Sequence, residues 1–111
     1  MIKTRLIPTL QMLSDQEHQE KVWLSENAPG YDSYPEALEV FYETWDLFKG
    51  EHAKGQLTPM ESHMLDELHF MIKKFDQTAD EEDMVKLLSD PKWGSIRQKA
   101  QDLLKLLMER R

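Results

Sequence analysis

The sequence predicts an all-α fold, a single-domain bundle of about five helices over residues 1–111. Three observations support this prediction: prolines at positions suited to helix starts, capping patterns ahead of apolar runs, and helical spacing within those runs. No two neighbouring runs show the alternation and tight-turn dipeptide of a β-hairpin. A chain of 111 residues is long enough for one hydrophobic core and too short for a second.

The first half of the chain contains one ambiguous segment and two predicted helices. Residues 1–13 are open between a short helix and an extended, loosely packed arm, because their apolar residues fit both. Ser14 to Glu17 has the pattern of a helix cap, and its helix ends before Pro29. A helix over 35–49 follows Ser33 and ends at Gly50.

The second half predicts three more helices. Thr58 to Glu61 is a capping box, in which each residue's side chain can accept from the other's backbone N–H, and it begins a helix over 59–75. Thr78 to Glu81 predicts the cap of a short helix through about Leu88. Asp90 and Pro91 begin the last helix, which reaches residue 108.

Three of these helices carry an apolar face that predicts the core. The faces are Leu38, Phe41, Tyr42, Trp45 and Phe48; Met60, Met64, Leu65, Leu68, Met71, Ile72 and Phe75; and Trp93, Ile96, Ala100, Leu103, Leu104 and Leu107. Large apolar side chains at helical spacing are the usual content of a core, so Trp45, Trp93 and Phe41 are expected to be structural.

Composition excludes several classes. The chain is 40% hydrophobic and 32% charged with four glycines, so neither disorder nor a fibrous fold is expected. It has no cysteine, which excludes disulfides and thiolate metal sites and favours a cytoplasmic location. No apolar stretch approaches the length of a membrane helix, and Met1 to Pro8 lacks the pattern of an export signal.

The net charge of −7 is unevenly distributed, because residues 14–90 alone carry −13 and both ends are basic. Such a surface repels the phosphates of nucleic acids and anionic membranes over most of its extent. It attracts cations over about one Debye length, roughly 8 Å at physiological salt. A basic protein partner is therefore expected, and nucleic acid and membrane are not.

The helix over 35–49 carries the candidate site. Its acidic residues, spaced three, four and three apart, form one ridge: Glu36, Glu39, Glu43 and Asp46. Val40 and Leu47 lie beside this ridge, away from the core stripe, so charge can steer a partner that apolar contacts then retain. Two alternatives stay open: the ridge is plain solvated surface, or another element covers the two aliphatic side chains.

The loop before this helix extends the candidate site. Tyr31, Asp32 and Tyr34 lie there, and tyrosine is a common hot-spot residue in protein interfaces. Packing of these tyrosines against the helices is the alternative. A second acidic cluster over 80–83 is attributed to its helix, because anions near a helix N-terminus stabilise that helix.

Catalytic and metal sites are not expected. Five potential ligands crowd the 59–75 helix: Glu61, His63, Asp66, Glu67 and His69. A di-iron bundle needs a Glu-x-x-His motif on each of two helices, and here only Asp66 and His69 have that spacing. No nucleophile or phosphate-loop motif is present, so we expect neither catalytic residues nor a cofactor. Phe70 is expected to pack beneath the N-terminal segment, or else to form a contact surface.

The order of two segments resembles the small helical immunity proteins of bacterial contact-dependent and related toxin systems. The resemblance covers about residues 34–72 and rests on Pro35-Glu-Ala-Leu-Glu-Val-Phe41, then Leu57-Thr-Pro-Met-Glu61 and Met64-Leu-Asp-Glu-Leu68. The helical pair at 80–108 has no match in it. What the resemblance implies is a protein without chemistry of its own that binds a toxin domain and blocks it.

Three functions therefore remain. The first is an immunity protein that neutralises a cognate toxin through the acidic helix face, as a monomer or weak homodimer. The second is a structural or scaffold module that forms a homodimer through Val40, Leu47 or Phe70. The third is a metal-dependent enzyme built on the helix that carries His63 and His69. The second predicts a dimer that Leu47→Asp separates, and the third requires stoichiometric metal.

Overall fold

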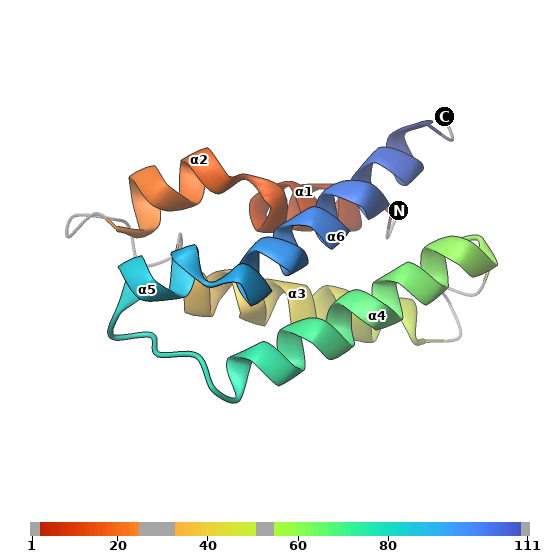
Figure 1. The fold of residues 1–111 in the computed structure, drawn as a ribbon. Coiled ribbons are helices and arrows are strands. Elements are labelled where there is room, and N and C mark those ends of the chain that lie inside the picture. Colours follow the sequence, from red (N-terminus) through yellow and green to blue (C-terminus); the bar gives the residue numbers. More distant parts are fainter. Residues whose placement is uncertain (1–2, 25–32, 51–54, 110–111) are drawn as a thin grey trace.

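The computed structural model describes residues 3–24, 33–50 and 55–109, and confirms the all-α class: these residues form helices and no strand (Figure 1). The longer helices are α1 (Lys3–Ser14), α3 (Tyr34–Phe48), α4 (Pro59–Asp76) and α6 (Pro91–Glu109). Shorter ones are α2 (Gln16–His18), the π-helix η1 (Gln19–Trp23) and α5 (Met84–Ser89).

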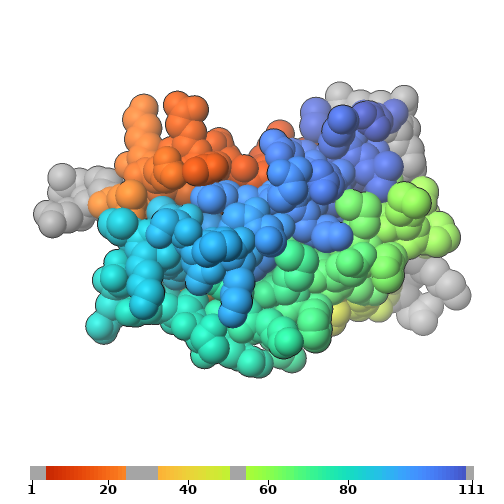
Figure 2. Space-filling model, in the orientation of Figure 1, coloured from red at the N-terminus to blue at the C-terminus, as the bar shows by residue number. Residues whose placement is uncertain are grey.

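The four long helices form an antiparallel ring. α1 packs against α3 and α6, and α4 packs against the same two helices from the other side. Successive long helices run in opposite directions along the bundle, while α2, η1 and α5 lie together at one end (Figure 1). In Figure 2 the near face is formed mainly by α4, α5 and α6, and α3 is largely hidden behind them.

The N-terminal segment is a helix that belongs to the core, so the alternative of a loosely packed arm is wrong. Leu6, Leu10 and Leu13 are each 0% exposed and line one face of α1. Each such burial contributes roughly 1.5–3 kcal/mol. This gain outweighs the cost of Pro8, whose missing N–H removes one backbone hydrogen bond inside the helix.

The predicted cores of α3, α4 and α6 are largely confirmed. Their fully or nearly fully buried residues include Leu38, Phe41, Leu65, Leu68, Ile72, Phe75, Trp93, Ile96, Ala100, Leu103 and Leu107. Met60 is an exception at 64% exposed. It stands in the first turn of α4, one residue before buried Glu61, so it lies on the flank of the buried stripe.

The helix starts predicted from the sequence agree with the structure in the long helices and differ from it in the short ones. The capping box at Thr58 and Glu61 is present, with N–H to oxygen distances of 2.9 and 3.1 Å. Two predicted caps are wrong. Asp15 caps α2 in place of Ser14, and α5 begins only after Asp83, which accepts from Lys86.

Candidate protein-binding face

The predicted acidic ridge lies on the outward side of α3. Ser33 caps the helix by accepting from the backbone N–H of Glu36 at 3.4 Å. Glu39, Glu43 and Asp46 are exposed and Glu36 is partly exposed. The structure therefore places all four carboxylates together along one side of a well-started helix.

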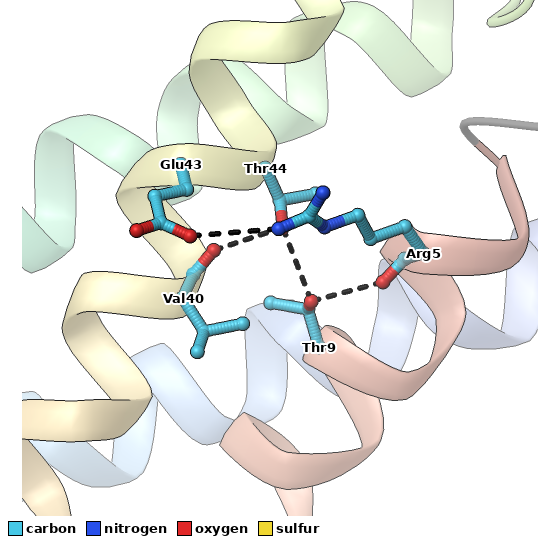
Figure 3. Close-up of polar contacts among 5 residues, drawn as sticks. All are labelled: Arg5, Thr9, Val40, Glu43 and Thr44. Carbon is cyan, nitrogen blue, oxygen red and sulfur yellow. Dashed lines mark hydrogen bonds and ion pairs between the residues drawn. The ribbon is translucent and has the colours of Figure 1, made fainter.

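Only one of these carboxylates is paired with a described residue. Arg5 Nη2 of α1 lies 3.5 Å from Glu43 Oε2, and both side chains are more than half exposed (Figure 3). An exposed pair of this kind contributes about 0–1 kcal/mol. Within residues 3–24, 33–50 and 55–109, no ion pair joins Glu36, Glu39 or Asp46 to a cation.

Lysines of α6 do not neutralise the ridge in the described part of the chain. Lys99 Nζ lies 3.4 Å from Glu67 on α4, which also contacts His63 at 3.0 Å. The negative potential of α3 is therefore reduced mainly by one arginine of α1.

A buried pair of threonines sets where α1 lies on α3. Thr9 Oγ1 and Thr44 Oγ1 are 3.3 Å apart, and both residues are buried. Thr9 also contacts the carbonyl of Arg5 at 2.9 Å, and Thr44 contacts that of Val40 at 2.8 Å (Figure 3). Because Thr9 lies one turn from Arg5, its contact with Thr44 brings the guanidinium of Arg5 within reach of Glu43.

The remaining predicted contact residues need correction. Val40 and Leu47 are partly buried rather than fully exposed. Tyr34 is 0% exposed, so its prediction as a surface contact is wrong. Tyr34 is the first residue of α3 and packs edge-on against Trp93, with ring centroids 5.4 Å apart. Tyr31 and Asp32 lie outside the described residues.

On the side of α3 that faces α4 lies an aromatic cluster that the sequence did not reveal. The rings of Trp45 and His69 are stacked at 3.7 Å and nearly parallel, at 8°. Trp45 Nε1 donates to Asp66 Oδ1 at 3.3 Å, and Lys49 pairs with the same carboxylate. His63 points elsewhere, since 75% of its side chain is exposed.

His69 should behave as a pH-sensitive group within this cluster. Burial, with Lys73 and Lys49 adding to it and Asp66 opposing it, holds the pKa of the imidazole below its usual 6.5. The folded state therefore favours neutral His69, and stability falls as the pH drops from 6.5 toward the folded pKa. We expect Trp45 fluorescence to change with a midpoint below pH 6.5, because a charged imidazole quenches a stacked indole.

A fluorescence titration of two variants checks this expectation. His69→Gln should abolish the transition, whereas the matched His63→Gln on the same helix should retain it. A midpoint at or above 6.5, or a transition that survives His69→Gln, contradicts the assignment.

The remaining candidate features of α4 are its potential metal ligands and Phe70. Among the described residues, no group of three or more His, Asp or Glu side chains is arranged to hold a metal ion. Phe70 is 62% exposed, so the expectation that it packs beneath the N-terminal segment is wrong. The Lys74 ammonium lies 5.4 Å from the centroid of the Phe70 ring.

No protein-family model, curated protein or solved structure matches this chain. None of the helices in the described ranges combines the length and apolar character needed to cross a bilayer.

Proposed function

We propose that this chain is a protein-binding module that engages a basic partner through the outer face of α3. The single observation that supports the proposal is the state of the ridge: Glu36, Glu39 and Asp46 form no ion pair with a described cation, and Glu43 forms only an exposed one. Partly exposed Val40 and Leu47 supply apolar area beside the charge.

Repulsion within the ridge and the long-range field explain why this face favours a partner. Like charges three and four residues apart on a helix destabilise it by a few tenths of a kcal/mol per pair. A cationic surface relieves that repulsion and gains favourable Coulomb energy. Since residues 14–90 carry −13 in total, the long-range field also accelerates the encounter.

The partner class that we propose is a toxin domain whose basic cleft the ridge would occupy. Support comes from the order of segments over residues 34–72 and from the acidic face itself. The probe for this proposal is the product of the gene next to the one encoding this chain, because immunity genes usually follow those of their toxins.

Association kinetics of this pair provide the test. Glu39→Lys combined with Glu43→Lys should slow association about tenfold at low salt and flatten its salt dependence, because both charges lie at the centre of the ridge. Arg5→Gln should act in the opposite direction and raise the association rate about twofold, because it leaves Glu43 unpaired. Circular dichroism should show an unchanged helix content in both variants.

A matched control separates the ridge from the net charge. Glu81 and Glu82 are exposed in the turn before α5, so Glu81→Lys with Glu82→Lys changes the net charge equally at positions outside α3. We expect this control to slow association by less than about threefold. Equal effects of the two double variants, or an affinity insensitive to salt, would reject the proposal.

A further inference from the structure

A polar cleft separates the end of α1 and the start of α2 from α6. Its volume is about 780 Å³, a size typical of sites for small ligands. Figure 2 shows it as a notch at the upper edge, where the orange residues of α1 and α2 meet the blue residues of α6. Its lining residues include Gln11, Asp15, Gly94, Arg97, Gln98 and Gln101.

Arg97 brings a partly buried charge to this cleft, and the acidic neighbour that acts on it, Glu20, does not come within ion-pair distance. Arg97 Nη1 lies 3.4 Å from Gln19 Oε1, an oxygen that already accepts from Trp93 Nε1 at 2.9 Å. No carboxylate of the described residues forms an ion pair with Arg97. Burial lowers the pKa of the guanidinium against the opposing effect of the Glu20 charge, which indicates that part of its hydration has been lost. A carboxylate would match the planar donor fork and restore what hydration supplied.

Asp15 brings the opposite charge to the same cleft. Its Oδ1 accepts from the backbone N–H of His18 at 3.0 Å, where it caps α2. The carboxylate forms no ion pair with a cation of the described residues, Arg97 included. Each carboxylate oxygen has more than one acceptor position, so Asp15 can also bind an ammonium group.

Gly94 leaves the backbone of α6 bare where it lines the cleft. A Cβ at this position would meet only Arg97 Nη2, at 4.0 Å, so alanine would fit. Glycine lowers helix stability relative to alanine, and no contact within the described chain requires it here. A glycine here leaves room for a ligand to approach the helix backbone closely.

We propose that this cleft binds a small zwitterion of the amino-acid class. Arg97 takes the carboxylate, Asp15 takes the ammonium, and the amide side chains of Gln11, Gln98 and Gln101 supply neutral donors and acceptors. This site is separate from the face on α3, because none of the cleft residues belongs to that helix.

Titration of the ¹⁵N-labelled full chain, followed by NMR, tests the proposal with three probes. L-glutamine carries both charges, succinate only carboxylates, and putrescine only ammonium groups, with NaCl at equal ionic strength as reference. We expect saturable shifts at Gly94 and at Arg97 Nε with L-glutamine, at a Kd of about 1 mM or tighter. Chemical shifts that change linearly with every probe would overturn the proposal of a zwitterion site. Succinate that saturates the site as L-glutamine does would also overturn it.

Substitutions in α6 test whether L-glutamine binds in this cleft. Arg97→Gln should weaken L-glutamine binding at least about tenfold, whereas Lys92→Gln, an exposed cation on the same helix, should leave it unchanged. Gly94→Ala should raise the melting temperature, because alanine favours the helix, and should weaken binding, because the added methyl group stands in the lining of the cleft beside Arg97. A stabilised Gly94→Ala that binds L-glutamine as tightly as the parent chain would also overturn the proposal.

Discussion

Replacing Gln19 by leucine is expected to lower the free energy of unfolding by about 3 kcal/mol, because it leaves several buried polar groups without partners. Gln19 is 0% exposed. Its Nε2 donates to the carbonyls of Met12 and Leu13 at 3.0 and 2.9 Å, and its Oε1 accepts from Trp93 at 2.9 Å. One side chain therefore joins the end of α1 to the start of α6.

The effect follows from how helices end. The last carbonyls of a helix receive no hydrogen bond from the N–H groups of their own helix. In α1, Gln19 donates to two of them. Leucine has nearly the same volume as glutamine, so the loss measures hydrogen bonding rather than a cavity. Urea unfolding monitored by circular dichroism gives the value.

The control is Gln16→Leu, since Gln16 is exposed and its side chain donates, among the described residues, only to Glu20 at 2.9 Å. It should change the free energy of unfolding by about 0.5 kcal/mol or less. A Gln19→Leu loss no larger than that of the control would show that the buried network contributes little.

The sequence predicted those features that each helix determines by itself. Thr58 and Glu61 specify a helix start within four residues, and the stripe from Leu65 to Phe75 follows from helical spacing alone. Pro91 likewise begins α6 where expected. Local chemistry determines these features, so no knowledge of the other helices was needed.

Features that depend on distant segments could not be predicted. Tyr34 reads as a loop residue, yet Trp23 and Trp93 from two other elements enclose its ring. Phe70 lies at helical spacing, yet 62% of it stays exposed. The pairing of Arg5 with Glu43 joins positions 38 residues apart, so the ridge's charges could be placed but not their partners.

Removing the hydroxyl of Tyr34 should make the protein less stable at neutral pH and less sensitive to alkali. The hydroxyl donates to Asp76 Oδ1 at 2.9 Å from within a buried aromatic cluster. Tyr34→Phe keeps the ring packing and removes this bond, at a cost of about 1–1.5 kcal/mol at pH 7.

Above pH 10 the Tyr34 hydroxyl has the opposite effect, because it lowers the free energy of unfolding as the pH rises. Burial, reinforced by the hydrogen bond to Asp76 and its negative charge, raises the pKa of the Tyr34 phenol well above its usual 10. The folded chain therefore keeps a proton that the unfolded chain releases near pH 10. Stability from this group is complete below pH 10 and falls above it by about 1.4 kcal/mol per pH unit.

Tyr34→Phe removes that slope, so the unfolding free energies of parent and variant should converge as the pH rises above 10 and cross near pH 11. Tyr42→Phe provides the comparison. Burial also raises the pKa of Tyr42, but its side chain is only partly buried, so the change in slope should be smaller. Urea unfolding at pH 7, 10 and 11.5 measures both variants. If the parent and Tyr34→Phe lose stability in parallel above pH 10, the unfolded chain gains nothing by releasing this proton, and the buried phenol is not what limits alkaline stability.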